Sequence, residues 1–179
     1  MKLIIPAFCL LFSGTCLAQD YCKDISKSVS DNKMIIDMAS PYDPESVYFN
    51  PLRVNRTLNK DEEEGFDNFF IVFQTTCGLD AINNILPGGG REEKNETKLH
   101  VEFTDNSRII DDSVQIAHDF TMDRTEAVRY VFYRLNEDTR KEFASKVIRK
   151  FTIAGQERLI PEDSATTLME YVKCMNQVK

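Results

Sequence analysis

The sequence contains no tryptophan, only two histidines, seven glycines and six prolines. Glycine and proline contents this low exclude collagen-like and low-complexity sequences, which are built on these residues. The shortage of histidine weighs against a Ser-His-Asp or Cys-His active site, because such a site needs a histidine base held by an orienting group. No Cys-x-x-Cys pair is present either, so a thioredoxin-type site or a zinc finger has no support.

What the 179 residues do contain is typical of a folded domain. Apolar residues make up 42% of the chain, charged residues 28%, and the formal net charge is -7. This apolar content is enough for a hydrophobic core, and the length fits one domain. The acidic balance argues against a nucleic-acid partner, because nucleic acids attract clusters of Lys and Arg.

The first 19 residues are typical of a signal peptide. A lysine is followed by the apolar stretch 3–12 and by a small-x-small signal that ends at Ala18. The stretch is shorter than the roughly 20 residues that span a bilayer. Thr15 stands where a lipidated cysteine needs a smaller neighbour, which disfavours a lipid anchor. We expect export to the periplasm or the extracellular space after cleavage near Ala18/Gln19.

The remaining residues, 20–179, are expected to form a single β-rich domain without a transmembrane segment. Residues 98–103 alternate between apolar and polar side chains, and a tight turn at Asp105-Asn106 leads into a second expected strand over 107–120, with a bulge or kink at Asp111-Asp112. Ala154-Gly155 predicts a further turn. The other predicted strands are 33–38, 47–58, 68–77, 127–135, 147–153 and 156–160.

Two helices are expected among these strands. Asn136 is a good N-cap for a short helix that runs through Phe143, with acidic residues in its first turn. Pro161 opens a second helix that ends at Gln177 and carries an apolar stripe from Ala165 onward. The sequence therefore predicts a mainly β (α+β) fold: an antiparallel sheet or sandwich of about 7–8 strands, one short helix and a C-terminal amphipathic helix.

Three cysteines remain after cleavage, namely Cys22, Cys77 and Cys174. An exported compartment permits disulfides, and the termini of a compact domain are often close together. We therefore expect a Cys22–Cys174 disulfide, with Cys77 buried in a strand. The alternative is that all three are buried thiols.

Candidate chemistry is sparse. Paired acids occur at several places, but adjacent acids in loops or at helix starts are usually solvated or capping, and no calcium loop or Gly-x-Ser-x-Gly motif is present. We expect no catalytic residues, no cofactor and no metal site. His100 is expected to be a solvated strand residue, and His118, in phase with Val114 and Ile116, a partly buried packing residue.

Three other features stay open. Tyr42, Tyr48 and Phe49 form a possible recognition surface, although a covering loop explains them as well. The loop Gly78–Thr97 is long enough to be functional or mobile. Asn55 and Asn95 are formal glycosylation acceptors that matter only in a eukaryotic secretory route.

Four segments together carry a resemblance: the Leu-Ala-Gln end of the signal peptide, the early Tyr21-Cys22-Lys23, the hairpin 98–110 and the block 146–175, which joins a hairpin to a helix bearing a cysteine. In these segments the chain resembles small exported proteins of Bacteroidetes-type bacteria that have no assigned activity. The resemblance implies a β-rich domain with a Cys-bearing C-terminal helix, and it supports the pairing of Cys22 with Cys174. It brings no catalytic residues.

The functional expectation is an exported, non-catalytic domain that binds a protein or glycan partner, or serves a structural role, at the cell envelope or outside the cell. One alternative is a secreted hydrolase that uses acidic residues. A cleft that gathers carboxylates, with one raised pKa, would favour it. The other alternative is a lipocalin-like carrier of a small molecule, which would need an open apolar cavity within a closed barrel.

Overall fold

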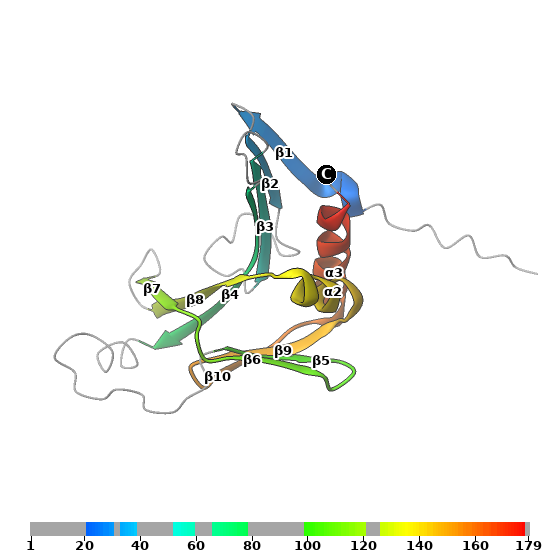
Figure 1. Cartoon of the computed structure of the whole chain (residues 1–179). Helices are drawn as coiled ribbons and strands as arrows, with labels where there is room; N and C mark the ends of the chain where they lie inside the picture. Colours follow the sequence, from blue (N-terminus) through cyan, green and yellow to red (C-terminus); the bar gives the residue numbers. More distant parts are fainter. Residues whose placement is uncertain are drawn as a thin grey trace, which may run out of the picture.

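The computed structural model describes residues 21–30, 33–38, 52–59, 66–78, 99–120 and 126–177. Within these ranges the chain forms ten β-strands, one 3-10 helix and two α-helices, and the strands pair antiparallel in two sheets (Figure 1). The predicted mainly β (α+β) class, with one short and one C-terminal helix, is therefore confirmed. The strand that begins the first sheet was not predicted, because its sequence, ISKSVS, has few apolar residues.

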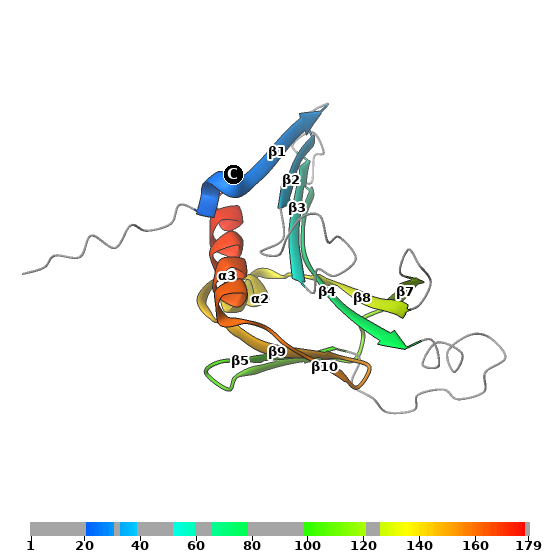
Figure 2. The same ribbon diagram turned by 180° about the vertical axis from the view of Figure 1, so that it is seen from behind.

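The larger sheet has six strands and is strongly bent. Their spatial order is β1 (Ile25–Ser30), β2 (Lys33–Met38), β3 (Leu52–Asn59), β4 (Phe66–Gly78), β8 (Glu126–Arg134) and β7 (Ile116–Phe120). In Figures 1 and 2, β1 to β3 stand upright, whereas β7 and β8 lie over the smaller sheet, and β4 runs from one part into the other. The bend gives this sheet a concave side on which the helices lie.

The smaller sheet has four strands and forms the second layer of a sandwich. Their order is β10 (Gln156–Leu159), β9 (Ile148–Ile153), β5 (Leu99–Phe103) and β6 (Arg108–Asp111). The two predicted turns are both confirmed. Asn106 has a φ of 65°, and the hairpin between β9 and β10 has positive φ at Ala154 and Gly155, as two-residue hairpins of this handedness require.

The segment 107–120 was expected to be one strand, and this expectation was wrong. Its first part, β6, pairs with β5 in the smaller sheet, and its second part, β7, pairs with β8 in the larger sheet. The chain changes sheets just after Asp111, whose carboxylate accepts hydrogen bonds from the backbone N–H and the hydroxyl of Ser113 at 2.8 and 2.6 Å. Such a local turn competes with continued pairing, so the predicted kink at Asp111-Asp112 separates two strands.

Aromatic side chains fill the space between the two sheets. The ring of Phe73 in β4 lies 5.1 Å from that of Phe151 in β9, 6.2 Å from that of Phe143 and 6.4 Å from that of Tyr133, measured between centroids. Phe103 of β5 packs on Phe143 at 5.4 Å. These contacts join both sheets and a helix in one core, which also contains the fully buried Phe69 and Ile71 of β4.

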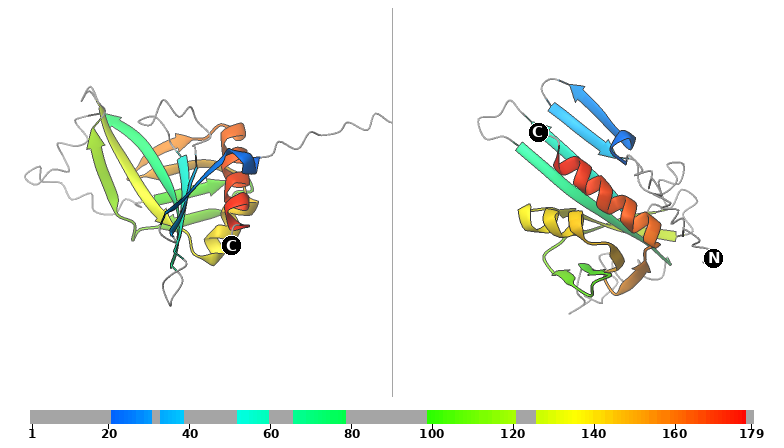
Figure 3. Two further views of the ribbon diagram at one scale, coloured as in Figure 1. Left: turned by 90° about the horizontal axis from the view of Figure 1, so that it is seen from above. Right: turned by 90° about the vertical axis from the view of Figure 1, so that its right-hand side faces the viewer.

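The helices are η1 (Tyr21–Asp24), α2 (Glu137–Ser145) and α3 (Glu162–Asn176). Asn136 caps α2 as predicted, because its side-chain oxygen accepts a 2.9 Å hydrogen bond from the N–H of Thr139. Pro161 occupies the N-cap position of α3 and not its first helical position. In Figure 3, α3 lies along β3 and β4, between α2 and the strands β1 and β2.

Candidate functional site

The predicted disulfide is confirmed. Cys22 in η1 and Cys174 in α3 are bonded, with their Cα atoms 5.4 Å apart and a sequence separation of 152. The bond ties the start of the described chain to the C-terminal helix. Cys77 lies in β4, opposite Ala127 of β8, and its side chain is outside the description.

Several sequence-predicted features lie outside the described residues. They are the possible recognition surface Tyr42, Tyr48 and Phe49, the glycosylation acceptor Asn95, and residues 79–97 of the long loop. Asn55 lies within β3, in register with Phe70 of β4. His100 lies in β5 and is half-buried, whereas His118 in β7 is exposed, so the packing role expected for His118 was wrong.

A charged cluster lies on the concave side of the larger sheet, where β3 and β4 meet the helices. Arg56 of β3 donates two hydrogen bonds to the carboxylate of Asp67 in β4, from Nε at 2.9 Å and from Nη2 at 3.0 Å. Arg140 of α2 donates a third, from Nη1 at 2.7 Å. Arg56 also donates to the carbonyl of Met175, in the last turn of α3. The carboxylate of Asp67 therefore connects β3, β4 and α2, and Arg56 extends the cluster to α3.

Both guanidinium groups of this cluster also lie against the ring of Phe69, with Arg56 at 5.6 Å and Arg140 at 5.1 Å from the ring centroid. Burial opposes the ionisation of Asp67, but the hydrogen bonds and the positive charges of the two arginines outweigh it and lower the pKa of this carboxyl. Asp67 is therefore an ionised acceptor at neutral pH, which is the opposite of what a general acid needs.

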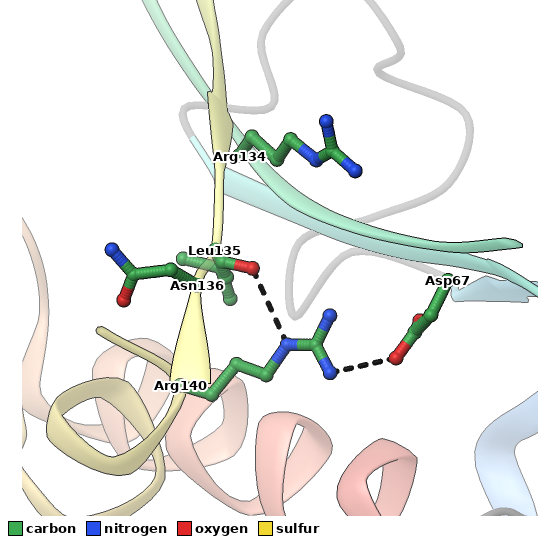
Figure 4. A pocket seen from close by; sticks show the side chains of 5 residues that line it. All are labelled: Asp67, Arg134, Leu135, Asn136 and Arg140. Carbon is green, nitrogen blue, oxygen red and sulfur yellow. Dashed lines mark hydrogen bonds and ion pairs between the residues drawn. The ribbon is translucent and has the colours of Figure 1, made fainter. Parts of the chain in front are cut away.

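A pocket of about 430 Å³ opens beside the cluster, at the junction of β8 and α2, and is lined by Asp67, Arg134, Leu135, Asn136 and Arg140. This volume is in the range of small-molecule sites. Figure 4 shows the guanidinium of Arg140 between the carbonyl of Leu135, which it reaches from Nε at 3.3 Å, and Asp67. The side chain of Arg134, at the end of β8, projects to the same side of that strand in this view.

A row of aromatic side chains covers part of the outer face of β4 and β8, the face turned away from the smaller sheet. We call Phe70, Tyr130 and Phe132 the aromatic row. Phe132 is 55% exposed, and the other two are partly exposed. The Phe132 ring lies 5.7 Å from that of Phe70, at 72°, and 5.4 Å from that of Tyr130, at 88°. Alternation along the strands places these rings opposite the core residues.

The aromatic row and the pocket are neighbours. Phe70 and Arg134 stand directly opposite each other in the register of β4 and β8, and Arg134 also lines the pocket. Side chains that face each other in this way have Cβ atoms about 5 Å apart. The aromatic row therefore ends at the positively charged side chain of Arg134.

The sequence analysis predicted neither the charged cluster around Asp67 nor the exposed aromatic row. Residues 127–135 read as one buried strand, because apolar residues occupy both faces and the pattern does not tell which face is covered. One signal was available for the cluster. Arg56 alternates in phase with the buried Leu52 and Val54, so an inward-facing arginine that needs an acidic partner could have been predicted.

Other functional elements were also sought in the described ranges. No group of three or more His, Cys, Asp or Glu residues there is placed to hold a metal ion. Neither described α-helix has the length and apolarity that a bilayer crossing requires. Comparison of the chain with protein-family models, curated proteins and solved structures found no match.

Proposed function

We propose that the protein is an exported, non-catalytic domain that binds a protein partner through the aromatic row. The observation that carries this proposal is the exposure of Phe132, which is 55% exposed although a filled core lies one residue away on either side. Aromatic residues and arginine are enriched where proteins bind each other, and Arg134 stands at the end of the row. A disulfide between Cys22 and Cys174 supports export, since such bonds persist in oxidising compartments.

The arrangement of the rings favours a protein over a glycan. Phe132 meets its two neighbours edge to face, at 72° and 88°, so the three rings do not lie in one plane. A sugar ring stacks on a flat aromatic face, whereas the side chains of a protein interdigitate with an uneven surface. The T-shaped row therefore suits apolar side chains of a partner.

The two alternatives have less support. For a hydrolase, the pocket supplies one carboxylate, Asp67, and its pKa is lowered, not raised. The carboxyls of Asp105 and Glu137 also have a lowered pKa, because each accepts hydrogen bonds, from Ser107 and Lys141 respectively. For a carrier, the space between the sheets is filled by the rings around Phe73.

The proposal is tested by a comparison of matched surface variants. Phe132→Ser removes the most exposed ring of the row, and Ile110→Ser removes an apolar side chain of similar exposure, 59%, from β6 on the other sheet. The tagged protein and both variants are incubated with envelope and culture-supernatant fractions, and retained proteins are quantified by mass spectrometry. A protein lost with Phe132→Ser and kept with Ile110→Ser is then purified, and its affinity is measured directly.

The expected result is an affinity at least about tenfold weaker for Phe132→Ser than for the Ile110→Ser control, because a loss above about 1 kcal/mol is found at only a minority of interface residues. The proposal is wrong if no retained protein distinguishes the two variants. It is also wrong if the purified protein binds both variants equally.

A further inference from the structure

The pocket beside the aromatic row has hydrogen-bond donors that the described chain does not use. Arg134 forms no ion pair with any described residue. Arg140 uses Nε and Nη1 for Leu135 and Asp67, and no described residue accepts from its Nη2. The side-chain oxygen of Asn136 accepts hydrogen bonds from Thr139, and no described residue accepts from the N–H groups of its side-chain amide.

The charge of the pocket is positive in an otherwise acidic protein. Two guanidinium groups, of Arg134 and Arg140, line the pocket together with the carboxylate of Asp67, so the charged side chains of this lining sum to one net positive charge. Two further carboxylates follow in the first turn of α2. Glu137 is paired with Lys141 at 2.8 Å and is 85% exposed, and Asp138 lies 4.0 Å from the same lysine and is 95% exposed. An anion in the pocket therefore meets fixed donors and a favourable field.

We propose that the pocket receives an acidic side chain, Asp or Glu, of the protein partner. The planar guanidinium matches a carboxylate with two parallel hydrogen bonds, and the unused Nη2 of Arg140 and amide of Asn136 add donors at the same place. The partner surface then combines apolar side chains on the aromatic row with a carboxylate next to them, because Phe70 lies directly opposite Arg134. This inference rests on the proposed function for the identity of its ligand.

The test uses a small probe and needs no partner. N-acetyl-L-glutamic acid α-amide carries one side-chain carboxylate, and N-acetyl-L-glutamine amide is its neutral match. Each is titrated into the ¹⁵N-labelled protein, and shifts are followed for the backbone amides of residues 134–140 and for the arginine Nε–H groups. The dissociation constant expected for a probe of about a dozen heavy atoms is on the order of 1–10 mM.

The glutamate probe is expected to shift the signals of Arg134, Asn136 and Arg140, and the glutamine probe is expected to leave them in place. Arg134→Gln should weaken the binding about tenfold, because a charged hydrogen-bonding group is lost. Arg158→Gln, which removes an arginine of β10 on the other sheet, should leave it unchanged. Arg134 is exposed, so its replacement should not unfold the protein.

Three outcomes overturn the inference: no saturable shift at about ten times the expected dissociation constant, equal shifts with sulfate, or tighter binding of glucuronate, which would indicate an acidic glycan. Failure of the proposed function is a separate result. If the probe binds but no partner distinguishes Phe132→Ser from Ile110→Ser, the carboxylate site stands and the aromatic row is not the docking surface. If the partner depends on Phe132 but the probe does not bind, only the carboxylate site is wrong.

Discussion

Arg140 of α2 donates a 2.7 Å hydrogen bond to the carboxylate of Asp67 in β4, across 73 positions of the sequence. Arg56 approaches the same carboxylate from the neighbouring strand with two further hydrogen bonds. The side chain of Arg56 is only 9% exposed, so Asp67 compensates a charge that water barely reaches. The cluster also forms one wall of the pocket, and its integrity matters for stability and for binding.

Asp67→Asn should destabilise the protein by about 2 kcal/mol, because it removes the negative charge that accepts two hydrogen bonds from the nearly buried guanidinium of Arg56, while Asp67 itself is partly exposed. The free energy of unfolding in urea measures the effect. Glu137→Gln is the matched control, since Glu137 is paired with Lys141 on the open surface of α2. Equal urea midpoints for Asp67→Asn and the wild type would contradict the structural role of the cluster.

The contribution of Asp67 to the free energy of unfolding should disappear in acid. Its pKa is lower in the folded than in the unfolded protein, because the two arginines stabilise the charged form more than burial disfavours it. The stabilisation is therefore complete above about pH 5 and is lost as the pH falls through the lowered folded-state pKa. Urea unfolding of the wild type and Asp67→Asn at constant ionic strength should show a stability difference that narrows below about pH 4. A difference that grows in acid would reverse the sign of this linkage.

The Cys22–Cys174 bond should stabilise the protein strongly. It closes a loop of 152 positions, and the chain-entropy model gives about 5 kcal/mol as an upper value for its loss. Replacement of both cysteines by serine should lower the free energy of unfolding accordingly. Non-reducing peptide mapping should recover one linked pair, and Cys77→Ser should not change that pair. Recovery of Cys22 and Cys174 as alkylated free thiols would reject the assignment.

The two faces of the larger sheet should differ in their sensitivity to truncation. Phe73→Ala empties a site between both sheets and α2, and should cost about 3–5 kcal/mol. Phe132→Ala acts on a side chain that is mostly in water and should cost less than about 1 kcal/mol. Thermal or urea unfolding of the two variants tests this contrast. A large loss for Phe132→Ala would place this ring in the core and remove the basis for a docking surface.

Local features of the sequence predicted much of the secondary structure. The Asn136 cap, the turns at 105–106 and 154–155 and the apolar stripe of the last helix each act within a few residues, so each was recognisable in the chain itself. The prediction failed where two local signals competed. Residues 107–120 have the alternation of a strand, but the turn at Asp111 moves the chain from one sheet to the other.

The sequence by itself determined where most strands and helices form, because capping, turn geometry and apolar spacing are short-range properties. The Cys22–Cys174 pairing was an expectation from the proximity of the chain ends and from a resemblance, and the tertiary structure decided it. Only the tertiary structure decided that Asp67 meets Arg140, since this contact depends on the order of strands in a bent sheet and on where α2 is placed. The same holds for the aromatic row. Apolar residues on both faces of β4 and β8 look alike in the sequence, and only the position of the second sheet determines that Phe73 is buried and Phe132 is exposed.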